Sequence, residues 1–114
     1  MAVSWGLIER YKFTACGALK AWSPQSTAAV YSITFKQDPL NRPKSHTVLY
    51  FGEAEDLAKE TSSMHYVIDA CSDGSVALED MFVFVHPMPG SSKGERTKVQ
   101  HELVGDYRPR GNGF

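Results

Sequence analysis

Two tyrosines, Tyr31 and Tyr50, are the side chains in this sequence whose type and placement best suit chemistry. Each lies in a short run rich in Val, Ile, Phe and Thr, which is typical of a β-strand. A phenol hydroxyl both donates and accepts hydrogen bonds. By residue type alone, the two tyrosines suit the edge of a core, where their hydroxyls would find local partners.

The other residues able to do chemistry give weaker signals. His65 falls in a predicted helix and His86 ends an apolar strand, so a packing or surface role explains both. Cys16 and Cys71 have neither metal-ligand nor redox spacing, and we expect two buried free thiols. No Ser-His or Cys-His pair of nucleophile and base follows from the spacing.

Length and charge limit the classes of protein that need be considered. A chain of 114 residues with 42% hydrophobic residues and a net charge of −1 is expected to form one globular domain. Binding of nucleic acid would need a local basic patch. No apolar run approaches the roughly 20 residues of a membrane span, so we expect a cytoplasmic protein without a membrane partner.

The strands that carry the tyrosines are predicted at Ala29–Phe35 and Thr47–Phe51, joined by a polar loop containing prolines. Gly52 ends the second strand. Glu53–Glu60 has helix-forming composition, and its acidic residues lie near the start, where the helix dipole favours them.

Three further elements follow. Thr61–Glu79 contains apolar residues at helical spacing, and Asp80–His86 is an apolar run of strand length. Ser92 and Glu95 form a capping box that begins a helix ending near Asp106. The buried stripe of this helix is expected to contain Val99, Leu103 and Val104.

Residues 1–27 are the least regular part, and we treat them as an N-terminal extension packed on a domain of residues 28–114. A short extended piece at Arg10–Thr14 and a helical turn at Gly17–Ala21 are predicted. Trp5 and Trp22 are expected to pack against the domain, with stacking on nucleic-acid bases as the alternative.

The order of these features resembles that of the GIY-YIG endonuclease superfamily. The motifs on which the resemblance rests are AVY at 29–31, LYFG at 49–52 and the acidic helix start EAEDL at 53–57. The far end agrees through Glu95, Leu103-Val104, Tyr107-Arg108-Pro109 and Asn112. The resemblance spans about Ala28 to Asn112 and implies an α+β fold, a small three-stranded antiparallel sheet flanked by helices.

The resemblance implies metal-assisted hydrolysis of a DNA phosphodiester. In that superfamily the two strand tyrosines lie in the site, an arginine on the following helix stabilises the phosphorane charge, and a glutamate on the last long helix holds a divalent cation. Attack on a phosphodiester builds charge on oxygen atoms, which a metal ion and a guanidinium can neutralise.

Carried over by position, Tyr31 and Tyr50 occupy the tyrosine positions, but Glu60 stands at the arginine position and Gln100 at that of the metal-binding glutamate. Glu60 would repel phosphate, and the amide of Gln100 is a weak ligand for a hard cation. Losing one such element typically costs about 10²–10³ in rate. We therefore expect catalysis to be lost and no cofactor to be bound.

The resemblance leaves three functions open. The first is a degenerate nuclease fold that still binds DNA. The second is a protein–protein interaction module, binding a partner or a second copy through an open strand edge. The third is an active endonuclease using Mg²⁺ or Mn²⁺ held by substitute ligands. Under the first, the residues expected to contact nucleic acid are Gly52, Lys59, His65, Arg108, Arg110 and Asn112.

Overall fold

The computed structural model describes residues 2–35, 47–60 and 80–112, with Arg110 described by its backbone only. The predicted helix within Thr61–Glu79, including His65 and Cys71, lies outside these residues.

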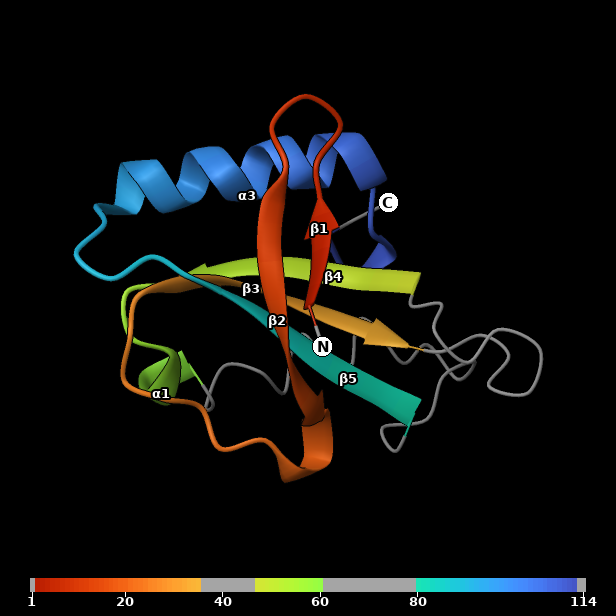
Figure 1. Cartoon of the computed structure of the whole chain (residues 1–114), viewed down its shortest axis with the longest axis vertical. Coiled ribbons are helices and arrows are strands. Elements are labelled where there is room, and N and C mark those ends of the chain that lie inside the picture. The colour runs from red at the N-terminus through yellow and green to blue at the C-terminus, as the bar shows by residue number, and fades with distance from the viewer. Residues whose placement is uncertain (1, 36–46, 61–79, 113–114) are drawn as a thin grey trace.

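The described residues form one antiparallel sheet of five strands in the order β1-β2-β5-β3-β4 (Figure 1). The α+β class is confirmed, whereas the prediction of three strands is wrong. The strands are β1 at Ala2–Trp5, β2 at Tyr11–Ala18, β3 at Ala29–Phe35, β4 at Thr47–Ala54 and β5 at Met81–Pro87.

The two additional strands come from the N-terminal residues. β5 is apolar on both faces and pairs with β3 along one edge, so its other edge requires a partner. β2 supplies that partner, with Thr14 opposite Val85 and Ala15 opposite Phe84. The residues from Tyr11 to Ala15 alternate between apolar and polar types, and a register shift between Ala15 and Ala18 then interrupts the pairing.

Within the described residues, the helices are short except for the last. They are α1 at Leu57–Glu60 and α3 at Lys93–Tyr107, with 3-10 turns η1 at Leu19–Ala21 and η3 at Arg110–Asn112. The helix predicted over Glu53–Glu60 begins later than expected, because β4 continues past Gly52 until Ala54 pairs with Ala29.

The prediction for α3 is confirmed, including its capping box. The Glu95 N–H donates to the Ser92 hydroxyl at 3.2 Å, and the Ser92 N–H donates to the Glu95 carboxylate at 2.9 Å. These hydrogen bonds lower the pKa of Glu95, with the Ser92 backbone as the main cause. At the other end, Arg108 adopts the left-handed conformation with φ of 46° and donates its N–H to the Val104 carbonyl.

An aromatic cluster fills the space between the sheet and α3. The Trp5 ring lies edge-on to Phe13, Phe51 and Phe84, with centroid distances of 5.0, 5.7 and 5.3 Å. Val99 and Leu103 cover this cluster from α3. Trp5 therefore packs in the core, as expected, and its contacts join β1 to β2, β4 and β5.

The opposite face of the sheet has its own core, in which Leu57 of α1 packs with Tyr31, Ile33 and Val83. Figure 1 shows α1 and α3 on opposite sides of the central strands. It also shows the β1–β2 hairpin standing across these strands, with its loop beside α3. The sheet therefore has an α3 face and an α1 face, and the two tyrosines belong to the α1 face.

The hairpin loop is attached to the last turn of α3 through two backbone donors. The Gly6 N–H donates to the Tyr107 hydroxyl at 2.9 Å, and the Leu7 N–H donates to the Asp106 carboxylate at 3.2 Å. Gly6 has φ of 125°, and a Cβ there would lie 1.8 Å from the Glu9 carbonyl oxygen. The loop therefore requires glycine at this position.

A buried ion pair joins β4 to the first turns of α3. Arg96 is 2% exposed, and its Nε donates to the Glu53 carboxylate at 3.0 Å. Its Nη1 donates to the Ser91 carbonyl at 2.6 Å and to the Ser91 hydroxyl at 3.1 Å. Lys93 approaches the same carboxylate only to 4.0 Å, with its side chain 82% exposed. Arg96 is thus the main counter-charge of Glu53, whose side chain is 15% exposed.

Removing one partner of this pair should destabilise the fold strongly, because it leaves the other charge buried and unpaired. Arg96→Met and Glu53→Leu should each lower the free energy of unfolding by about 3 kcal/mol, and the double variant by clearly less than the sum. Urea denaturation of the native chain, both single variants and the double variant measures the coupling energy between Arg96 and Glu53. Lys93→Ala is the control, and it should lower the free energy of unfolding by less than about 1 kcal/mol. Additive losses would contradict the pairing.

Candidate functional site

The structure brings Tyr31 and Tyr50 together. Their ring centroids are 6.0 Å apart, and Tyr31 is 2% exposed. The Tyr31 ring lies directly over Gly52, where an added Cβ would be 2.4 Å from the ring atom Cζ. Gly52, predicted to contact nucleic acid, therefore has a packing role: it leaves room for the tyrosine ring of the neighbouring strand.

The surroundings of Tyr31 keep its hydroxyl protonated. Burial raises its pKa most, followed by the effects of Tyr50 and of the Glu60 carboxylate. Because Tyr31 is a neutral phenol at physiological pH, it can donate a hydrogen bond but cannot serve as an anionic base. Glu60, at the arginine position of the resemblance, thus acts on Tyr31 as a nearby negative charge.

A hollow of about 330 Å³ lies where β4, α1 and the start of α3 meet. Glu53, Glu55 and Glu60 line it together with Lys93 and Arg96. Since the guanidinium of Arg96 is bound to Glu53, the charge that remains in the hollow is mainly negative. Lys59 is exposed on α1 and borders a second hollow with Glu55, Asp56 and Glu60. Such surfaces repel phosphate.

Gln100 and Asn112 act together on the edge strand β4. The Gln100 side-chain amide donates to the Phe51 carbonyl at 3.0 Å. Asn112 accepts from the Phe51 N–H at 2.9 Å and donates to the same carbonyl at 3.0 Å. Phe51 packs on the α3 face, opposite the tyrosines. These two residues therefore occupy backbone groups of the strand edge that a partner strand would need.

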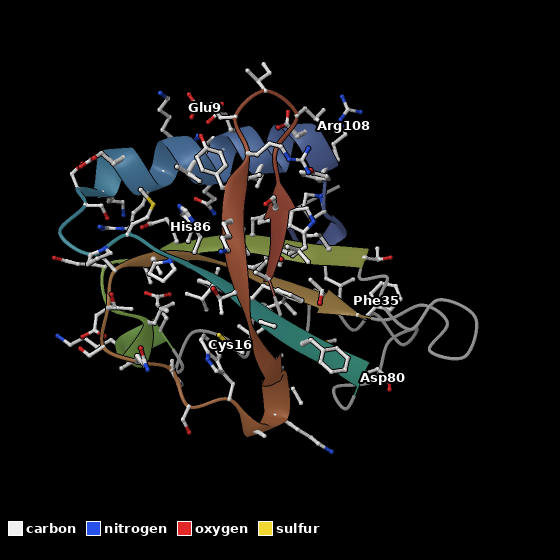
Figure 2. The ribbon with its side chains drawn as sticks, in the orientation of Figure 1. Glu9, Cys16, Phe35, Asp80, His86 and Arg108 are labelled. Carbon is white, nitrogen blue, oxygen red and sulfur yellow. The ribbon has the colours of Figure 1, made fainter. Side chains whose placement is uncertain are left out.

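The remaining predicted residues are spread over the molecule. Arg108 is exposed at the end of α3, and Arg110 lies in η3. His86 places Nδ1 2.7 Å from the Lys12 carbonyl oxygen and packs beside aromatic rings. Cys16 is exposed, so the expectation of a buried thiol is wrong for this residue. Figure 2 places Cys16 on β2 well away from Glu9 in the hairpin loop.

Sequence reasoning missed two polar clusters. One is the Arg96–Glu53 pair, although Arg96, Val99 and Leu103 follow the helical spacing of a buried stripe. The other is the Tyr11 hydroxyl, which lies 2.9 Å from the Glu9 carboxylate and 2.6 Å from that of Glu102. Burial and both carboxylates raise the pKa of Tyr11. No spacing in the sequence indicates this second cluster, because its members lie 91 positions apart.

The outward surface of α3 differs in charge from the tyrosine face. Lys93, Lys98, His101 and Arg108 are exposed along it. The acidic residues of this helix each accept a hydrogen bond within the molecule, Glu95 in the capping box while exposed, Glu102 from Tyr11 and Asp106 from the hairpin loop. We call Lys93, Lys98, His101 and Arg108 the basic face of α3; Lys93, at one end of it, also borders the acidic hollow.

No group of three or more His, Cys, Asp or Glu side chains in the described ranges is arranged to hold a metal ion. Among the same residues, no helix combines the length and apolar character that crossing a membrane would need. Comparison of the chain with protein-family models, with curated proteins and with solved structures gave no match.

Replacing Gln100 by the glutamate that the resemblance would require should weaken the fold. Gln100→Glu turns the donor toward the Phe51 carbonyl into an acceptor, so we expect a loss of about 1–3 kcal/mol in the free energy of unfolding. Gln100→Ala should lose less, because Asn112 still donates to that carbonyl. Chemical denaturation tests this order, with the exposed Lys98→Glu as control. If Gln100→Glu left the free energy of unfolding unchanged, the hydrogen bond from Gln100 to the Phe51 carbonyl would be refuted.

Tyr31 should make stability fall in alkaline solution. In the folded state the pKa of Tyr31 is raised above its ordinary value of 10.0, so the unfolded chain loses this proton first as the pH rises. The contribution of Tyr31 to the free energy of unfolding is therefore complete below pH 10 and declines above it. The slope should approach about 1.4 kcal/mol per pH unit for this group. Unfolding by urea between pH 8 and 11.5 should show a shallower decline for Tyr31→Phe than for the native chain. Equal pH slopes for Tyr31→Phe and the native chain would refute the raised pKa of Tyr31.

Proposed function

We propose that this chain is a GIY-YIG-like domain that does not cleave nucleic acid and instead binds it through the basic face of α3. The arrangement of β3 between β4 and β5, and the adjacent rings of Tyr31 and Tyr50, support the likeness. The basic face carries the binding part of the proposal.

Two features argue against catalysis at the tyrosines. Tyr31 is a buried, neutral phenol beside the Glu60 carboxylate, and the nearby hollow has a negative excess. A phosphodiester entering this hollow would be repelled where a nuclease must attract it. Gln100, the residue at the metal-binding position, uses its amide to hold β4 from the α3 face.

The basic face of α3 offers the opposite conditions. Lys98 and His101 are exposed three positions apart and are therefore neighbours on the helix surface, and Arg108 is exposed just beyond the helix end. The acidic residues of α3 accept hydrogen bonds within the protein but keep their negative charge, so the binding part of the proposal rests on Lys98 and Arg108. Such a surface fits the phosphate backbone and predicts strongly salt-dependent, sequence-independent binding.

A second candidate function, protein–protein interaction, is favoured by one observation. Leu7 and Ile8, in the β1–β2 loop, are 68% and 90% exposed. The loop is held to α3 by its own backbone, so it presents both aliphatic side chains in an ordered position. Ordered, exposed apolar residues with charged neighbours are typical of the centre of a protein interface.

Binding to single-stranded and duplex DNA should therefore depend on the basic face and on salt. Lys98→Ala/Arg108→Ala should weaken binding at least about tenfold and lower the slope of log K against log salt by roughly one to two. Fluorescence anisotropy from 50 to 300 mM NaCl measures both. Lys12→Ala, an exposed change on β2, is the control. Binding that ignores the double variant would refute the proposed face.

The same samples separate the other functions. With Mg²⁺ or Mn²⁺ we expect no cleavage of any DNA, and cleavage lost in Tyr31→Phe would overturn the claim of an inactive site. If DNA does not bind, and Leu7→Ser/Ile8→Ser removes self-association or a defined protein partner, the interaction function replaces the one proposed.

A further inference from the structure

We propose that a groove beside Trp22 binds an uncharged, flat heteroaromatic ring of the nucleobase class. The groove encloses about 460 Å³, within the range of small-molecule sites. It lies on the α1 face, between β2, the residues after η1 and the start of α1. It is therefore separate from the basic face of α3, and the inference does not depend on the proposed function.

The lining of the groove determines the charge of its occupant. None of the described residues that line it is charged, whereas the hollow beside Glu53 is lined mostly by ionisable groups. Trp22, Leu57, Val85 and Pro87 supply the apolar part of the wall. A charged ligand would lose hydration here without gaining a counter-charge, so a neutral ligand is favoured.

Trp22 gives the groove an aromatic surface. Its side chain is half-buried, and its ring lies 6.4 Å from that of Tyr31, centroid to centroid, at 40°. Because Tyr31 is buried and packed on Gly52, this contact holds the indole in position. Stacking of a base on an aromatic side chain is worth about 1–3 kcal/mol, and every base has a suitable face.

Polar residues in the lining favour a heteroaromatic ring over an aliphatic molecule. Thr14, Ser23, Gln25 and Thr27 bring hydroxyl and amide groups to the groove, and Cys16 adds a thiol. These groups both donate and accept hydrogen bonds, as do the edges of nucleobases. An aliphatic ligand would cover these groups without offering them a hydrogen-bond partner.

The walls are held before any ligand arrives. The Trp22 N–H donates to the Leu19 carbonyl at 3.2 Å, closing η1. On the other side, the Leu57 N–H donates to the Thr27 carbonyl at 3.0 Å, and the Ser26 hydroxyl donates to Asp56 at 2.9 Å. A pre-formed site loses less conformational entropy on binding than a flexible one.

The test measures binding of adenosine and cytidine by calorimetry and, separately, protection of Cys16. The native chain should bind at least one nucleoside, and Trp22→Ala should weaken binding at least about tenfold. Lys20→Ala, next to the groove but outside its lining, should leave nucleoside binding unchanged. In a Cys71→Ser chain, the same nucleoside should slow the reaction of Cys16 with a thiol reagent.

A second arm identifies the source of the ring. A hexanucleotide and its abasic counterpart distinguish an unpaired base of a strand from a free nucleoside: binding of the hexanucleotide alone, lost with Trp22→Ala, also supports the site. Three results would overturn the proposal. The first is that neither a nucleoside nor the hexanucleotide binds at millimolar concentration, although the chain shows its normal thermal unfolding. The second is unchanged binding in a folded Trp22→Ala variant, and the third is tighter binding of hexanol than of any nucleoside.

Discussion

The fold depends on covering the aromatic side of the sheet. Phe51 and Phe84 point toward α3 from two strands, and a single helix leaves part of this surface open. Trp5 and Phe13 of the β1–β2 hairpin complete the cover, since the Trp5 ring contacts phenylalanines on three different strands. Burial of these rings, each worth a few kcal/mol, is the reason why the N-terminal residues belong to the sheet.

The elements with a clear period could be predicted from the sequence. β3 begins and ends where expected, and β5 and α3 differ by about one residue. β4 continues past its predicted end at Phe51 because Gly52 does not break the strand. The Tyr31 ring fills the space that a side chain at Gly52 would take. Only the first part of β2 was predicted, as the extended piece at Arg10–Thr14; its later residues follow a register shift, and its partner β5 lies far away in the sequence.

The candidate site likewise has one part that the sequence indicates and other parts that it does not. The closeness of Tyr31 and Tyr50 follows from two neighbouring strands, which the sequence indicates. The binding of Gln100 and Asn112 to Phe51 depends on where the chain passes after α3, which no local pattern reports. The basic residues Lys98 and Arg108 are exposed, whereas Glu102 accepts a hydrogen bond from Tyr11 on a distant strand. Charge counted along the sequence cannot make that distinction.

The position of β5 in the sheet also has a consequence for synthesis of the chain. β5 lies between β2 and β3, so the two hairpins that precede it cannot join until residue 87 has been made. Until then each hairpin exposes an open edge, and an isolated two-stranded hairpin is marginally stable in water. Folding of this domain is therefore expected to be late and cooperative, completed only when the last third of the chain leaves the ribosome.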